Sequence, residues 1–148
     1  MTQKNKELLL KDLCGRIMYG VKCSVYEDTS VYTLSGVLPN KIYNELYFEE
    51  LDWKECDGFA DIQYCKPHLF PLSSMTDEVW DKEFRGCGIT EFTRDSFKYG
   101  CETLEFNNSN PNLSSTVKFI NQLIKNHFDI YGLIPKGLAI DATGKNIY

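Results

Sequence analysis

Val21-Lys22-Cys23-Ser24-Val25-Tyr26 is the stretch that decides the fold, because its apolar and polar residues alternate. A period of two places the apolar members on one face of an extended strand and the polar members on the other. The polar turn Glu27-Asp28-Thr29-Ser30 follows, and residues 31–38 form a second strand-like run that is closed by Pro39-Asn40. This pattern predicts an antiparallel hairpin.

Further short strands are predicted downstream of the hairpin. Residues 45–49 are interpreted as a third strand, and residues 59–65 alternate again and are predicted as a fourth that ends before Pro67. Four consecutive short strands favour a meander that curls into a small barrel. Residues 89–106 are expected to hold one or two more strands, and a short strand at residues 138–141 is expected to close the sheet edge.

Helices are predicted at both ends and in the middle of the chain. The first begins with Asn5 as its cap and ends at Gly15, a residue suited to a left-handed stop. The second begins with Thr76 as its cap and brings Trp80 against Phe84 one turn later.

The third predicted helix is amphipathic and lies near the C-terminus. Its apolar stripe consists of Leu113, Val117, Ile120 and Ile124, widened by Leu123 and Phe128. Its polar side consists of Lys118, Asn121, Gln122 and Lys125. The predicted class is therefore α+β: a small antiparallel sheet or partly open barrel with an N-terminal, a mid-chain and a C-terminal helix, in one domain over residues 1–148.

Composition and charge exclude several classes of protein. Of the 148 residues, 43% are hydrophobic and 25% are charged, which is typical of a globular chain and not of a disordered or collagen-like one. The net charge of -5 disfavours nucleic-acid binding, because phosphate backbones repel an acidic surface. No apolar run reaches the roughly 18 to 20 residues of a membrane span, and the start does not resemble a signal peptide. We therefore expect a cytoplasmic protein that does not bind membranes.

Six cysteines are interpreted as buried free thiols, because disulfides are rare in a reducing cytosol. No two of them have the short spacing of a zinc knuckle, and the chain has only two histidines. We expect no metal and no cofactor. The cysteines are Cys14, Cys23, Cys56, Cys65, Cys87 and Cys101.

A ligand site is predicted in the stretch that leads into the mid-chain helix. It combines a cation, an imidazole and hydroxyls beside a helix N-terminus, which is a favourable place for a phosphate or carboxylate. The candidate ligand-binding residues are Lys66, His68, Ser73 and Ser74. The alternative is an ordinary helix cap beside a solvated lysine.

Aromatic residues make up 14% of the chain, and nine of them are tyrosines. Tyrosine is enriched at protein interfaces, because it is both apolar and able to form hydrogen bonds. The candidate interface residues are Tyr32, Tyr47, Tyr64, His127 and Tyr131. The alternative is that the aromatics are ordinary strand residues.

A third candidate site is Asp52-Trp53-Lys54 with Asp61 nearby. An acidic residue two positions before a lysine is a pattern of metal-dependent nucleases, in which carboxylates hold Mg²⁺. The pattern is short and arises often by chance. The surrounding acidic residues 49–57 also fit a solvated surface.

Three segments resemble small bacteriophage and prophage proteins of gut bacteria that have no assigned activity. They are Leu10-Lys11-Asp12-Leu13-Cys14, the junction at residues 66–76 and the closing segment at residues 127–140. The resemblance implies a phage or prophage origin and the cytoplasm of a bacterial host. It implies no catalytic residues.

These observations favour a non-enzymatic phage accessory protein that acts by binding. Its partner would be a host protein or a second copy of the chain. One alternative is an anti-defence protein that sequesters a phosphorylated nucleotide signal. A second alternative is a metal-dependent hydrolase or nuclease.

Overall fold

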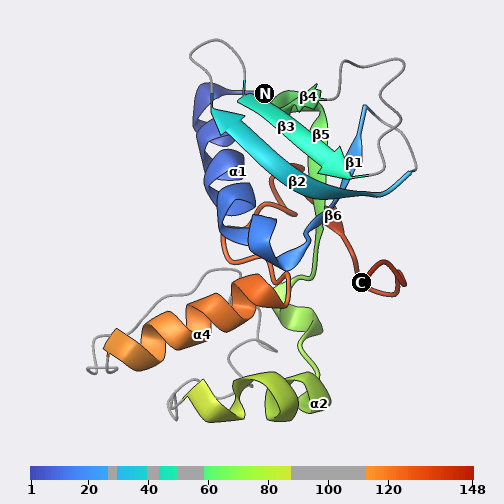
Figure 1. The fold of residues 1–148 in the computed structure, drawn as a ribbon. Helices are drawn as coiled ribbons and strands as arrows, with labels where there is room; N and C mark the ends of the chain where they lie inside the picture. The colour runs from blue at the N-terminus through green and yellow to red at the C-terminus, as the bar shows by residue number, and fades with distance from the viewer. Residues whose placement is uncertain (27–29, 40–43, 50–58, 88–112) are drawn as a thin grey trace.

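The computed structural model describes residues 1–26, 30–39, 44–49, 59–87 and 113–148. These residues form an α+β fold, in which a six-stranded, mostly antiparallel sheet packs with an N-terminal helix (Figure 1). A smaller helical unit lies at one end of the sheet (Figure 1). The predicted α+β class is confirmed, and the single-domain organisation stays a prediction.

The predicted hairpin is confirmed. β1 (Lys22–Val25) pairs antiparallel with β2 (Tyr32–Pro39), which pairs antiparallel with β3 (Asn44–Glu49). Cys23 and Val25 are buried, whereas the residues between them are only partly buried. The alternation in sequence therefore corresponds to a core face and an outer face of the sheet.

The predicted fourth strand over residues 59–65 is confirmed only at its start, because the chain turns in the middle of the segment. β4 (Phe59–Asp61) pairs with β3, a single 3₁₀ turn follows, and β5 (Cys65–Leu69) pairs with β1. The Asp61 carboxylate accepts a hydrogen bond from the backbone N–H of Gln63 at 2.9 Å. Such a local bond competes with strand pairing and favours the turn.

The sheet is strongly curled. β4 and β5 occupy the first and fifth positions of the strand order β4-β3-β2-β1-β5-β6. In a flat sheet these positions are about 19 Å apart, whereas the four Cα–Cα steps from Asp61 to Cys65 span at most about 14 Å. Among the described residues, β4 pairs only with β3, so the sheet curls without closing.

β6 (Ile140–Asp141) forms the edge of the sheet next to β5, within the predicted 138–141 segment, but its pairing is parallel. Pro67 lies inside β5 opposite Cys23, although the sequence pattern predicts that the strand ends before Pro67. Pairing with β6 begins only at His68. Pro67 can therefore occupy the strand without removing a hydrogen bond to β6.

The N-terminal helix α1 (Gln3–Arg16) is longer than predicted at both ends. The Thr2 side chain caps it by accepting a hydrogen bond from the Asn5 backbone N–H, so Asn5 is not the cap. Gly15 lies inside the helix, and the left-handed residue is Gly20, whose φ is 66°. The extension brings Arg16 into a buried ion pair that the sequence did not reveal.

The main core lies between α1 and the concave side of the sheet. Leu9 and Leu13 of α1 are fully buried there. The strands contribute most of the remaining buried side chains: Cys23, Val25, Leu34, Leu46, Phe48, Ala60, Cys65 and Leu69.

The helical unit contains α2 (Asp77–Val79), which continues through a wider π turn to Phe84. The Thr76 hydroxyl accepts a hydrogen bond from the Val79 N–H at 3.3 Å, which confirms the predicted cap. The rings of Trp80 and Phe84 stack with their centroids 5.6 Å apart, which confirms the predicted contact.

α4 (Leu113–Lys125) confirms the predicted C-terminal helix, but its buried face is rotated from the predicted stripe. Phe119 and Leu123 are fully buried, whereas Val117 is 47% exposed. The ring of Phe119 packs edge-on against the ring of Phe84, with their centroids 5.4 Å apart. An aromatic partner from another segment therefore sets the orientation of the helix, and periodicity within the helix does not contain this information.

Strands predicted at residues 89–106 lie outside the described residues, as do the acidic residues 50–57. Within the described ranges, no helix combines the length and the apolar character that are needed to cross a lipid bilayer.

Candidate functional site

Two of the predicted ligand-binding residues lie on β5 beside a serine of β1. Ser24 and Lys66 are register partners, and the Ser24 hydroxyl oxygen lies 2.9 Å from Nε2 of His68. Lys66 is exposed and forms no ion pair with another described residue. The three side chains therefore form a polar cluster on the β1–β5 pair.

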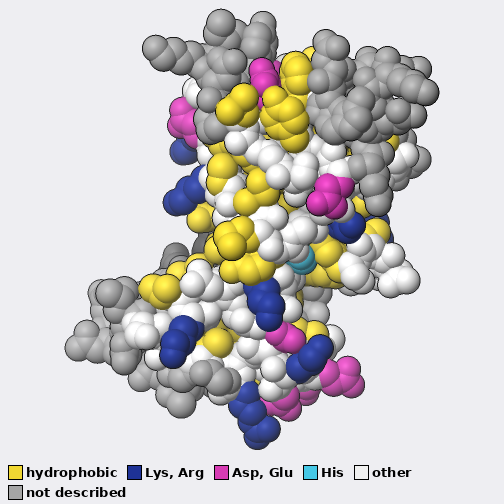
Figure 2. All heavy atoms as spheres, in the orientation of Figure 1, with side chains coloured by type: hydrophobic (Ala, Val, Ile, Leu, Met, Phe, Trp, Pro, Cys, Tyr) yellow, Lys and Arg dark blue, Asp and Glu magenta, His cyan; other side chains and the backbone are white. Residues whose placement is uncertain are grey.

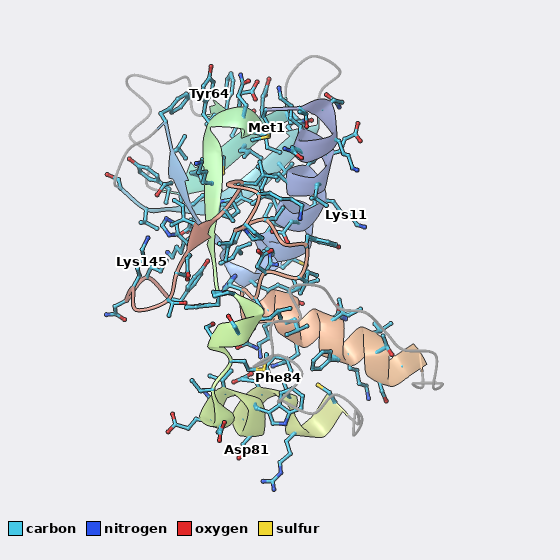
Figure 3. The ribbon with its side chains drawn as sticks, turned by 180° about the vertical axis from the view of Figure 1, so that it is seen from behind. Met1, Lys11, Tyr64, Asp81, Phe84 and Lys145 are labelled. Atoms are coloured by element: carbon cyan, nitrogen blue, oxygen red, sulfur yellow. The ribbon has the colours of Figure 1, made fainter. Side chains whose placement is uncertain are left out.

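His68 is only 4% exposed, and its Nδ1 has no hydrogen-bond partner among the described residues. Burial, with the charge of Lys145 as a second cause, lowers the pKa of His68. Lys145 extends from the C-terminal segment alongside the strands (Figure 3). A neutral imidazole is therefore favoured, and its Nε2 can form one hydrogen bond with the Ser24 hydroxyl, as donor or as acceptor.

Ser73 and Ser74 lie on a separate turn beyond β5 and do not join this cluster through any hydrogen bond between described residues. The Ser74 hydroxyl donates to the Pro71 carbonyl at 2.7 Å, and Ser73 is exposed. The N-terminus of α2 is capped by Thr76 and carries two acidic residues in its first turn. This helix start therefore does not favour an anion, and the cap interpretation accounts for it.

Tyr26 and Tyr64 form a stacked pair where β1 ends and β5 begins. Their ring centroids are 5.0 Å apart, and the Tyr26 N–H donates to the Tyr64 carbonyl at 3.1 Å. The side chains are 47% and 50% exposed. Tyr26 has a φ of 56°, a left-handed conformation that is unfavourable for a bulky residue. Tyr64 was a candidate interface residue, whereas Tyr26 was not.

The other candidate tyrosines are more enclosed. Tyr47 lies near Phe59, with ring centroids 6.2 Å apart, and a hydrogen bond to Glu45 raises its pKa. Tyr32 packs partly buried against the main core, and so does Tyr131. The structure places Tyr64 at the surface more fully than these three, and the interface role of each stays a prediction.

His127 is buried at the C-terminal end of α4 and adopts a φ of 59°. The Phe128 N–H returns to the Leu123 carbonyl at 2.9 Å, which is the bond that closes a Schellman motif. The Tyr148 ring stacks on the imidazole with centroids 4.0 Å apart. Burial, with the charge of Arg16 as a second cause, lowers the pKa of His127 to about 4.

The sequence did not reveal the buried ion pair between Arg16 and Asp12. Two Arg16 nitrogens donate to the Asp12 carboxylate, each at 2.8 Å, and both residues are buried. The same guanidinium donates to the Ile124 carbonyl at 3.2 Å and to the Phe128 carbonyl at 2.6 Å. Burial raises the pKa of Asp12, although the Arg16 charge opposes this rise. An acid four residues before a base was the available signal, but it fits a surface pair equally well.

The metal-site interpretation has little support from the described residues. Asp61 lies 4.0 Å from the Lys6 ammonium and caps the turn at Gln63, while Asp52 and Lys54 lie outside the described residues. In the described part of the chain, no three His, Cys, Asp or Glu residues are grouped to hold a metal ion.

The four described cysteines are free thiols, as predicted, although Cys14 is exposed and not buried. Burial raises the pKa of Cys23 well above its usual value, with neighbouring Cys65 adding to the rise. Both thiols lie in the main core, and the raised pKa of Cys23 keeps that thiol protonated and unreactive near neutral pH. Cys56 and Cys101 lie outside the described residues.

Comparison with known proteins identifies no relative. No protein-family model, curated protein or solved structure matches this chain. The resemblance to phage proteins therefore stays a prediction.

Proposed function

We propose that this protein acts by binding a protein partner, with the Tyr26–Tyr64 pair as its contact surface. The single observation that carries the proposal is the combination of exposure and strain at Tyr26. A left-handed conformation costs a residue with a side chain roughly 1–2 kcal/mol. Glycine avoids this cost, so a tyrosine at this position is explained by a contact that its ring makes with the partner.

The arrangement of the pair supports a role in recognition. Each ring is about half exposed, and stacking fixes their mutual orientation. A rigid aromatic side chain loses little conformational entropy on binding, which is why tyrosine dominates many protein interfaces. Lys66 lies two residues beyond Tyr64, about 7 Å along an extended chain, and offers an exposed cation, with no ion pair to another described residue, for a partner's carboxylate.

The substitution Tyr26→Gly tests the strain argument. We expect a change of less than about 1 kcal/mol in the free energy of unfolding, because relief of the strained φ offsets the lost ring stacking. Partner binding is expected to fall at least tenfold, as for loss of an aromatic hot spot. Urea denaturation measures the first quantity. A loss of stability above about 2 kcal/mol would show that the ring serves the fold instead.

The binding itself can be tested with a photo-crosslinking amino acid placed at Tyr64. The matched control carries it at Lys82, a strongly exposed position in the helical unit. In lysate of the cells that carry the gene, we expect one discrete adduct from Tyr64 that is absent from Lys82 and lost with Tyr26→Gly. An adduct of two 17.1 kDa chains in the purified protein would identify the partner as a second copy. Identical adducts from both positions, or none, would contradict the proposal.

A second candidate function is the binding of a phosphorylated small molecule at Ser24, Lys66 and His68. The exposed Lys66 beside a hydroxyl and a buried imidazole favours it. In a thermal-shift assay with a nucleotide panel, we expect one member to raise the melting temperature by several degrees, and Lys66→Ala to abolish this rise. Lys82→Ala is the matched control. A flat response to the whole panel rules this function out.

A further inference from the structure

A second exposed surface lies at the opposite end of β1, where the sheet meets the helical unit. Met18 is 88% exposed, and Tyr19 and Tyr148 are 40% and 44% exposed. We call these three residues, with the ring of His127 between the two tyrosines, the Met18 patch. Tyr64 lies at the other end of the sheet from the helical unit that contains Phe84, so the patch is distinct from the Tyr26–Tyr64 pair (Figure 3).

Contacts across His127 make the patch continuous. The imidazole lies beside the backbone of Tyr19 and stacks on the ring of Tyr148. Met18 is next to Tyr19 in the chain. Figure 2 shows hydrophobic side chains on both sides of a histidine, where the molecule narrows between the sheet and the helical unit.

The backbone that presents the patch is held on both sides. Met18 lies in the 3₁₀ turn Ile17–Tyr19, between the fully buried Arg16 and the left-handed Gly20. The Tyr148 hydroxyl donates to the His68 carbonyl at 2.6 Å and accepts from the Lys22 N–H at 3.2 Å. The exposed side chains therefore sit on an ordered support, which lowers the entropy lost on binding.

The charges beside the patch favour an acidic partner over a second copy of the chain. The Lys22 N–H donates to the Tyr148 hydroxyl, and the Lys22 ammonium donates to the Thr33 hydroxyl at 2.6 Å, a neutral partner that leaves its charge uncompensated. Lys125 lies two residues before His127 and is 54% exposed. Glu83 lies 3.7 Å from Lys125 and offsets part of its charge. A twofold dimer through the patch would bring both sets of lysines together. Three side chains also offer less than the roughly 800 Å² that each partner of a stable complex buries.

We propose that the Met18 patch docks a short acidic segment of a protein partner. An apolar side chain of that segment contacts Met18 and Tyr19, and its carboxylates contact Lys22 and Lys125. Methionine suits this role because its flexible thioether adapts to the side chain that it meets. The inference concerns a different surface from the proposed function and stands independently of it.

Selection from a random peptide library displayed on phage tests the proposal, with the full chain as bait. We expect enriched peptides to be net acidic around one or two Leu, Phe or Trp residues. The best of them, as a fluorescent synthetic peptide, is expected to bind Met18→Ser about tenfold more weakly than the wild type. Lys22→Glu should weaken it about fivefold, and salt should weaken it as well.

The matched control is Leu38→Ser, because Leu38 is a 51% exposed residue on β2 outside the patch. This variant and Tyr26→Gly are expected to bind the peptide like the wild type. Enrichment of basic peptides, or of none that distinguish Met18→Ser from Leu38→Ser, would overturn the proposal. A peptide that loses affinity for Tyr26→Gly instead would assign the docking to the other surface.

Discussion

Replacing Arg16 with methionine is expected to lower the free energy of unfolding by about 3–5 kcal/mol. The substitution leaves the Asp12 carboxylate buried without its partner, and removes the donor to the Ile124 and Phe128 carbonyls at the end of α4. A buried carboxylate without a partner is penalised by desolvation, and so are unpaired backbone carbonyls. Urea denaturation followed by circular dichroism measures the loss.

The double variant Asp12→Leu with Arg16→Met is the control for this experiment. It removes both charges together, so we expect it to be more stable than Arg16→Met alone by at least about 1 kcal/mol. The matched surface variant is Lys11→Met, because Lys11 is exposed on the same helix. If Arg16→Met cost no more than Lys11→Met, the buried ion pair would not be the contact that joins α1 to α4.

Acidification from pH 6.5 to pH 4 is expected to destabilise the protein, with His127 contributing on the order of 3 kcal/mol. Burial lowers the pKa of His127 from 6.5 to about 4 in the folded state. Between these values the unfolded state binds more protons, so stability falls as the pH falls through this window. Above pH 6.5 His127 is neutral in both states and causes almost no loss of stability. The lowered pKa of His68 likewise makes stability fall as the pH falls.

Urea denaturation at several pH values between 7 and 4 measures this dependence against His127→Asn. Asparagine tolerates the left-handed conformation and does not titrate. Any constant cost of the lost ring cancels when the two pH slopes are compared. We expect the wild type to lose more stability than the variant across the window. Equal slopes would mean that His127 is not the group that titrates.

Local patterns were sufficient for the elements whose cause lies within a few residues. The alternation at residues 21–26 predicted β1 and its buried face, and Thr76 predicted the start of α2. The turn after β4 had a local cause as well, since Asp61 caps it. Alternation alone did not reveal the turn, because two short strands in succession produce the same pattern as one longer strand.

The candidate sites were predicted only in part, because side chains from distant segments complete them. Lys66 and His68 were named from sequence, but their partner Ser24 lies more than forty residues earlier. Tyr64 was predicted as an interface residue without Tyr26, because the left-handed conformation of Tyr26 cannot be predicted from the sequence pattern. Ser73 and Ser74 were grouped with Lys66 through proximity in the chain alone.

The sequence by itself determined the α+β class, the hairpin and the positions of the helices, because periodicity and capping act over a few residues. Only the tertiary structure decided which face of α4 is buried, that Arg16 joins α1 to the end of α4, and that Tyr148 stacks on His127. These contacts join segments that are far apart in the chain. Their energies come from desolvation and packing, which exist only after the segments meet.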